Sequence, residues 1–436
     1  MNTVDIIIKK RDDRELSEDE IRYIVDGYTS GAIPDYQMSA FLMAVYFRGM
    51  NDEETICLTK TMRDSGEVMD LSGIAGIKVD KHSTGGVGDK TTLIVGPAAA
   101  ACGVPVAKMS GRGLGFTGGT IDKLGAIPGF HVTMAYEDFV KQVNSTGIAV
   151  TGQTGHIAPA DKKIYALRDV TGTVDNLSLI TSSIMSKKLA AGSDAILLDV
   201  KCGSGAFMKT EQDARRLAEL MVKIGSAAGK ETVAVITDMD QPLGRAVGNS
   251  LEVREAIDTL RGEGPADFKE VVFALGSQML MLAGRAADEK EARALMEGVI
   301  EDGSALDKFA QFVRAQGGDA APVYDTSLLP VAGKTLEVTA KESGYVHRIL
   351  AEDIGIACMT LGGGRETKES AIDLSVGIIL EKKNGDAVSD GEVLATIYGN
   401  DDAKMQAAYE KIAHAYEIAK EPAAFVPVVR EYIFPE

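Results

Sequence analysis

Residues 194–201 read DAILLDVK and residues 232–239 read TVAVITDM, two short apolar segments with β-branched side chains. Between them, residues 210–228 carry apolar side chains at the spacing of an amphipathic helix. Residues 104–109, VPVAKM, repeat the strand pattern. Strands that alternate with helices predict an α/β domain with a mostly parallel sheet. Such sheets bind ligands beyond the carboxyl ends of their strands.

Two glycine-rich segments follow apolar segments of this kind. They read KHSTGGVGDKTT at residues 81–92 and KMSGRGLGFTGGTIDK at residues 108–123. Glycine lets main-chain N–H groups approach an anion, serine and threonine add donors, and lysine adds a full positive charge. Facing each other, the two segments would form a pocket for a small, doubly charged oxyanion. Inorganic phosphate is the obvious candidate.

Two nucleotide-binding motifs are similar to these segments but fit them poorly. A Walker loop needs glycine followed directly by lysine, whereas Gly88 is followed by Asp89, whose carboxylate would face the phosphates. Residues 113–118 formally match the GxGxxG dinucleotide fingerprint. However, Glu137 and Asp138, about 20 residues further on, lie at the start of a predicted helix and not at a strand end. The fingerprint alone therefore carries little weight.

The composition limits the class of partner. The 436-residue chain has a formal net charge of −18, which argues against nucleic acid or an anionic membrane, since both need a broad basic face. No apolar run reaches about 18 residues and the first residues lack a secretory pattern, so we expect no membrane association. Four cysteines, scattered without metal-binding spacing, are typical of reduced thiols in a cytoplasmic protein.

Changes in the residue pattern along the sequence predict three units. Residues 1–69 form a small all-helical domain, joined in space by about residues 160–190, where the helical pattern returns. Residues 70–159 and 191–335 form a larger α/β domain that binds phosphate. Residues 336–436 form an α+β unit whose turns resemble those of biotinyl or lipoyl carrier domains. No lysine lies in the Met-Lys-Met setting that modification requires, so this unit is predicted to be structural.

His82 differs from the other histidines because it lies inside the first glycine-rich segment. There it could donate a hydrogen bond or a proton to a leaving group beside the phosphate. A lone histidine is more often structural, which is what we expect of the other four.

Arg168, Ser183 and Lys187 form a further candidate group. Ser183 and Lys187 are four residues apart on a predicted helix and share one face. Three donors aimed together suit a planar ligand with carbonyl oxygens. A solvated helix face for Lys187, and an ion pair of Arg168 with Asp161 or Asp169, explain the same residues equally well.

Three long segments resemble the signature segments of the thymidine and pyrimidine-nucleoside phosphorylases. They are KHSTGGVGDK at 81–90, SGRGLGFTGGTIDKL at 110–124 and YALRDVTGTVDNLSLITSSIMSKKLA at 165–190, and the similarity extends along the chain. The resemblance implies cleavage of uridine, thymidine and deoxyuridine by phosphate, giving free base and (deoxy)ribose 1-phosphate. It also implies a homodimer built through the helical domain, phosphate as co-substrate and no organic cofactor.

Matching positions in that family imply three sets of ligands. The phosphate site is Lys81, Ser83, Thr92, Lys108, Ser110 and Thr120. The base site is His82, Tyr165, Arg168, Ser183 and Lys187, of which His82, Arg168 and Lys187 are expected to act in catalysis. Some members bind a monovalent cation, expected to be K⁺, through carbonyls matching Gly88, Lys90, Leu243 and Ala246 and a carboxylate matching Glu255.

Two positions depart from the family pattern, and one refines the substrate. Phe116 replaces a usual histidine and Gly125 a usual carboxylate, so the packing of this loop is expected to differ. Lys108 is typical of broad-specificity members, where thymidine-specific ones tend to have methionine. The alternatives are a thymidine-specific phosphorylase, a non-catalytic nucleoside or phosphate sensor, and an anthranilate-type phosphoribosyltransferase. That transferase would need magnesium, for which Asp89 and Asp122 are candidate ligands.

Overall fold

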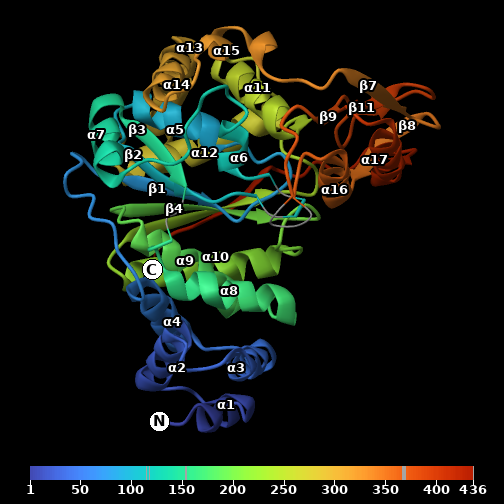
Figure 1. Cartoon of the computed structure of the whole chain (residues 1–436). Helices are drawn as coiled ribbons and strands as arrows, with labels where there is room; N and C mark the ends of the chain where they lie inside the picture. The colour runs from blue at the N-terminus through green and yellow to red at the C-terminus, as the bar shows by residue number, and fades with distance from the viewer. Residues whose placement is uncertain (114, 117, 153–154, 366–369, 436) are drawn as a thin grey trace.

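The computed structural model of the chain describes residues 1–113, 115–116, 118–152, 155–365 and 370–435. In Figure 1 the N-terminal helices lie at the bottom, the sheets and their covering helices above them, and a smaller β-rich part at the upper right. The predicted fold class is therefore confirmed: a helical part, an α/β part with a mostly parallel sheet, and a C-terminal α+β unit. The likeness of that last unit to carrier domains stays a prediction.

The helical part is built from two separate stretches of chain. Its elements are α1 (Thr3–Arg11), α2 (Glu18–Ser30), α3 (Asp35–Arg48), α4 (Asp52–Asp64), α8 (Pro159–Thr171) and α9 (Leu177–Ala190). Helices α2 and α4 both begin in capping boxes, formed by Ser17 with Glu20 and by Asn51 with Glu54. Side chains of α8 and α9 belong to the same buried apolar cluster as those of the first four helices.

The central sheet has the strand order β1-β4-β5-β13. Strands β1 (Val79–Ser83), β4 (Ala195–Cys202) and β5 (Glu231–Asp238) are parallel, and β13 (Val429–Ile433) runs antiparallel to β5. A second parallel pair is formed by β2 (Val106–Ser110) and β3 (Ile148–Gly152).

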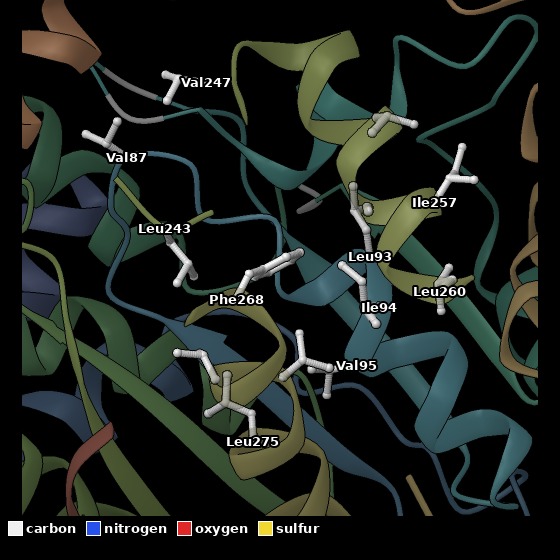
Figure 2. Packing of buried hydrophobic residues seen from close by; sticks show 14 of the residues in the cluster. Val87, Leu93, Ile94, Val95, Leu243, Val247, Ile257, Leu260, Phe268 and Leu275 are labelled. Carbon is white, nitrogen blue, oxygen red and sulfur yellow. The ribbon is translucent and has the colours of Figure 1, made fainter. Parts of the chain in front are cut away.

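Strand β4 is buried on both faces, and its side chains alternate between two hydrophobic clusters. Ile196 and Leu198 pack with α10 (Glu211–Ala227), whereas Leu197 belongs to the main cluster with α12 (Ala266–Leu282). Figure 2 shows part of the main cluster around Phe268 and Leu243. The remaining helices of this part are α5 (Thr92–Ala101), α6 (Thr120–Leu124), α7 (Tyr136–Thr146), α11 (Asn249–Leu260), α13 (Glu289–Glu301), α14 (Ser304–Ala315), α15 (Ala321–Tyr324) and the short 3₁₀ helix Thr326–Leu328.

The C-terminal unit contains two antiparallel sheets, ordered β10-β8-β12 and β6-β9-β11-β7. Its elements are β7 (Lys334–Thr339), β8 (Gly344–Ile349), α16 (Ala351–Leu361), β9 (Gly377–Leu380), β10 (Ala387–Val388), β11 (Val393–Gly399), α17 (Asp402–Ala415) and β12 (Tyr416–Ala419). Strand β6 (Ala246–Val247) joins it from the α/β part, and β13 returns to the α/β sheet, where it covers the edge of β5. Residues 429–433 thus lie outside the unit expected for 336–436, while the three-way division itself stays a prediction.

Glu54 connects three parts of the N-terminal helices. Its carboxylate oxygens each lie 2.9 Å from Lys10 Nζ, and they accept the N–H groups of Leu16 at 2.8 Å and Asn51 at 2.9 Å. Lys10 and Glu54 are only 4% and 3% exposed. Loss of the carboxylate charge would therefore leave a buried ammonium group without its counter-charge.

We expect Glu54→Gln to lower the free energy of unfolding by about 3 kcal/mol, because removing one member of a buried ion pair costs about 3–5 kcal/mol. Glu53→Gln, on the exposed side of the same helix, should stay within about 0.5 kcal/mol of the unmodified chain. Urea unfolding followed by circular dichroism measures both. Equal stability of the two variants would contradict the structural role of Glu54.

Candidate active site

The two glycine-rich segments have the same local design. Each leaves the carboxyl end of a parallel strand and enters a helix: Ser83 and Ser110 end β1 and β2, while Thr92 and Thr120 begin α5 and α6. Hydroxyl groups and main-chain N–H groups at such positions are well suited to an anion. Within the second segment, Leu114 and Thr117 lie outside the described residues, so the GxGxxG match of 113–118 has no full structural account.

Lys81 and Lys108 bring the two segments together. Lys108 Nζ donates to the main-chain carbonyl of Lys81, and Lys81 Nζ donates to Thr91 Oγ1 at 2.5 Å. The two lysines are 4% and 5% exposed. Burial lowers the pKa of Lys108 to about 7; attraction to Asp80 opposes the shift and repulsion by neighbouring lysines adds to it.

Buried carboxylates pair with these lysines. Asp80 lies 2.8 Å from Lys188 Nζ and 3.6 Å from Lys108 Nζ. Asp199 lies 2.8 Å from the Nζ atom of Lys201 and 3.3 Å from that of Lys81. Sequence reasoning missed these partners, although charged residues inside fully buried strands were a visible signal.

Asp89 belongs to the same charged region. Its Oδ1 accepts hydrogen bonds from Thr91 Oγ1 at 2.6 Å and from Thr91 N at 3.2 Å. Although burial alone would raise it, the pKa of Asp89 lies well below its usual value, because Lys81, Lys201 and Lys123 attract its charge. The carboxylate is therefore ionised and turned toward its own loop.

His82 lies on β1 beside these lysines. Burial lowers its pKa well below the usual value, and repulsion by several lysines, Lys188 and Lys108 foremost, lowers it further. The imidazole is therefore neutral at pH 7, which suits it to hydrogen bonding and not to the donation of a proton as an imidazolium. Its Nε2 is buried and has no hydrogen-bond partner among the described residues.

Arg168 lies in the α8–α9 segment and is 1% exposed. Its Nε, Nη1 and Nη2 donate to the carbonyls of Thr173, Leu179 and Val174 at 3.1, 2.9 and 2.7 Å. The ring of Tyr165 lies 5.5 Å from its guanidinium carbon. Arg168 therefore holds the turn between two helices, and it pairs with neither of the aspartates considered from the sequence.

Ser183 and Lys187 meet on α9, as their spacing predicts. Lys187 Nζ donates to Ser183 Oγ at 3.0 Å and forms an ion pair with Asp161 of α8. Sequence reasoning assigned Asp161 to Arg168 as a possible partner, whereas the structure pairs it with Lys187. The interaction holds the lysine across the two helices, with its side chain 23% exposed.

Three of the five oxygens expected to hold a monovalent cation come together, but around a side chain. Lys90 Nζ donates to the carbonyls of Leu243 at 2.8 Å and Ala246 at 2.9 Å, and lies 2.6 Å from Glu255 Oε2. A Cβ atom on Gly88 would lie 2.7 Å from the Leu243 carbonyl oxygen, so only glycine fits there. The residues therefore do not fit a K⁺ ion, because an ammonium group already contacts the same oxygens.

The second segment is braced by the C-terminal unit. Arg365 Nη1 and Nη2 each lie 2.8 Å from the carboxylate of Asp122, which also accepts Gly113 N at 2.8 Å. Phe116, one of the two departures, packs against the main hydrophobic cluster next to Gly355 of α16. Gly125, the other, follows α6 directly. Neither lies among the expected ligands.

Three domain families match the chain in order. They are the helical bundle domain of the glycosyl transferase family at residues 4–66, the a/b domain of that family at 75–306, and the pyrimidine nucleoside phosphorylase C-terminal domain at 345–419. The chain is 60% identical over 416 residues to a pyrimidine-nucleoside phosphorylase of Geobacillus stearothermophilus, covering 94% of this chain and 96% of that protein. The chain belongs to the pyrimidine-nucleoside phosphorylase family.

A second member of the family, the pyrimidine-nucleoside phosphorylase of Bacillus subtilis, is 58% identical over 434 residues, covering 99% of this chain and 100% of that protein. Among solved structures, an anthranilate phosphoribosyltransferase from Thermus thermophilus aligns with a TM-score of 0.58 at 19% identity, covering 72% of this chain and 99% of that one. At that identity the likeness concerns the fold alone. The phosphorylase family assigned from the sequence is confirmed.

The titration of Lys108 gives a test of whether this residue binds phosphate, as the family resemblance implies. With a pKa of about 7, Lys108 carries its charge below that pH and loses it above, so kcat/KM for phosphate should fall as the pH rises through 7. In Lys108→Met this component should be absent, and at pH 6 kcat/KM should be roughly 10- to 100-fold lower, the value of a charge-assisted hydrogen bond.

Steady-state rates between pH 5.5 and 8.5 measure both profiles. The ionisation of phosphate itself affects both enzymes equally, so the ratio of the two profiles isolates the lysine. A ratio that does not change with pH would contradict the assignment.

Proposed function

We propose that this enzyme cleaves uridine, thymidine and deoxyuridine with inorganic phosphate, giving the free base and (deoxy)ribose 1-phosphate. Membership of the family supports the reaction class. The observation that carries the proposal is the contact between Lys81 and Lys108, which joins the two glycine-rich segments above a buried charged cluster. Lys81 and Lys108 place positively charged side chains where both segments meet, in a chain whose net charge is −18, and a phosphate site in an acidic protein needs such local charge.

In the proposed mechanism, phosphate attacks the anomeric carbon of the sugar directly. Lys81, Ser83, Thr92, Lys108, Ser110 and Thr120 hold the phosphate. The glycosidic bond breaks early, which leaves positive charge on the sugar and negative charge on the pyrimidine. Phosphate oxygens stabilise the sugar, and no covalent enzyme intermediate is needed. A phosphate oxygen forms a bond to the anomeric carbon as the bond from that carbon to the base nitrogen breaks, and the electron pair of the broken bond leaves on the base. The proton that hydrogen phosphate gives up ends on the base.

The leaving base receives hydrogen bonds and charge from the other half of the site. Lys187 supplies a cation and neutral His82 a hydrogen bond, while Ser183 and Tyr165 contact the ring. Donors placed where negative charge develops stabilise a transition state more than a ground state. Arg168 contributes its positive charge. Its hydrogen bonds to the carbonyls of Thr173 and Leu179 also hold the segment between α8 and α9 in position.

Phosphate and nucleoside are held by different parts of the molecule. The phosphate residues lie on β1, β2 and the helices that follow, whereas the base residues other than His82 lie on α8 and α9, which pack with the N-terminal helices. We therefore propose that the parts close before reaction, which aligns the attack and excludes water.

Three competing functions are less well supported. An anthranilate-type transferase would need acidic magnesium ligands, but Asp122 is bound to Arg365 and Asp89 to Thr91. A thymidine-specific enzyme fits less well because Lys108 stands where such enzymes tend to have methionine. A non-catalytic sensor has no feature in its favour beyond Phe116 and Gly125.

We also propose a homodimer through the helical part and a cytoplasmic location. Tyr36 and Phe47 on α3 and Val170 on α8 are 75%, 74% and 78% exposed, and largely exposed apolar side chains on these helices suit an interface. A monomer in sedimentation velocity would refute the dimer. The four cysteines carry free thiols, which supports a reducing compartment. In the part of the chain that the structure describes, no helix is long and apolar enough to cross a membrane.

The first experiment measures base release from uridine, thymidine and deoxyuridine by ultraviolet difference spectra, with and without inorganic phosphate. We expect phosphate-dependent release from all three. Release from the deoxynucleosides alone would mean a thymidine-type enzyme, and release from none would favour the transferase or the sensor.

Lys187→Ala tests the base site. We expect kcat to fall by roughly 100- to 1,000-fold, the effect of removing one donor to a developing anion. Because Asp161 would lose its partner, the double variant Lys187→Met with Asp161→Asn controls for an unpaired buried carboxylate. Lys162→Ala, an exposed position on the same helix pair, should keep its rate. Normal turnover in Lys187→Ala would refute its role in stabilising the base.

Arg168→Ala is a poorer test of the base site than Lys187→Ala. As an expected catalytic residue, Arg168 should lower turnover when it is truncated. The structure shows a buried guanidinium that satisfies three main-chain carbonyls. Truncation would leave those carbonyls unpaired, so stability should fall together with the rate.

A further inference from the structure

Lys90 lies near the end of the first glycine-rich segment and is 1% exposed. Its ammonium group contacts three oxygens: the carbonyls of Leu243 at 2.8 Å and Ala246 at 2.9 Å, and Glu255 Oε2 at 2.6 Å. An ammonium group has three hydrogens, so each has an acceptor. The ring of Phe268 faces the group at 5.1 Å from its centroid, and Figure 2 shows this ring beside Leu243.

We propose that the ammonium group of Lys90 is a tethered monovalent cation, which takes the place of a dissociable ion in this oxygen cage. Main-chain carbonyls and one carboxylate are the donor set that a monovalent cation binds. The positive charge is on a side chain of the protein itself. That side chain belongs to the first glycine-rich segment, which a bound cation would otherwise hold in place.

Electrostatics makes the two occupants alternatives. A K⁺ ion bound to the same oxygens would lie within a few ångströms of the Lys90 charge, in a site with little access to water, where repulsion is strong. The main-chain carbonyl of Lys90, a further expected ligand, accepts Leu93 N at 2.9 Å in the first turn of α5. The oxygens can therefore bind only one cation, and that cation is the ammonium group of Lys90, which is covalently part of the chain.

A second lysine holds the opposite side of the same turn. Lys383, in the C-terminal unit, donates to the carbonyls of Pro242 and of Gly244, the latter at 2.7 Å, and lies 3.0 Å from Asp267. Residues 242–246 are thus held between two ammonium groups, one from the phosphate loop and one from the C-terminal unit. The position of the first glycine-rich segment therefore depends on side chains of the protein and not on the concentration of an ion.

The first test uses the unmodified enzyme. Its melting temperature and its rate of phosphorolysis are compared in KCl and in tetramethylammonium chloride at equal ionic strength, since tetramethylammonium is too large for the cage. We expect both quantities to be the same in the two salts. A higher melting temperature or rate in KCl would overturn the proposal.

The second test opens the cage. We expect Lys90→Thr to melt lower in tetramethylammonium chloride, by on the order of 5 °C, because Glu255 loses its counter-charge. K⁺ or Rb⁺ should restore part of that loss, and crystals grown with Rb⁺ should show an anomalous peak beside Glu255 in this variant only. A Lys90→Thr variant that is unaffected by K⁺, or a Rb⁺ peak there in the unmodified enzyme, would overturn the proposal.

Two further variants isolate the cause. Lys90→Met fills the cage without charge and should show no response to K⁺, whereas Lys341→Thr removes an exposed lysine elsewhere and should behave as the unmodified enzyme. If Lys90→Thr fails to fold, the comparison of salts and the Rb⁺ crystals of the unmodified enzyme still decide the question. The melting temperatures and the Rb⁺ peaks do not depend on the proposed reaction, so its failure would be seen separately.

Discussion

Lysine charge buried beneath two glycine-rich segments is the constraint on which the rest of this structure depends. Removing an ammonium group from water is costly unless a carboxylate lies close by. Strand β1 pairs with β4 so that Ser83 lies opposite Asp199, which brings that aspartate within 3.3 Å of Lys81 Nζ. A slip of one residue in this register would turn the aspartate to the other face of the sheet. The buried lysine charge of the site therefore requires this register of the two strands.

The sequence predicted the parts of the fold whose signal is local. The strands at 194–201 and 232–239 and the helix between them each follow from a short run of residues. Pairings between distant segments left no such trace. Asp80 meets Lys188, which is 108 positions away, and Asp161 meets Lys187 and not Arg168. Such choices depend on how helices and strands pack, which spacing along one element does not encode.

The candidate site shows the same division. Family resemblance placed the expected phosphate ligands on the two glycine-rich segments, and that role stays a prediction. Spacing placed Ser183 and Lys187 on one helix face, where they are hydrogen-bonded. Neither indicated that Arg168 would be occupied by three carbonyls or that the side chain of Lys90 would turn into the oxygen cage. Both contacts depend on which acceptors lie within the length of a long side chain, and these acceptors are set by the folded structure around it. The C-terminal unit takes part as well, since Arg365 and Lys383 support segments next to the two loops.

Strand β13 has a consequence for the order in which the molecule can be assembled. It completes the central sheet beside β5, from which it is separated by about 190 residues of chain. At a synthesis rate of about 5–20 residues per second, the edge of β5 stays without that partner for roughly 10–40 s. During that interval, a buried, β-branched strand presents unpaired main-chain groups to neighbouring nascent chains. The central sheet is therefore completed late in synthesis, and a shortened chain that lacks β13 leaves this edge of β5 unpaired.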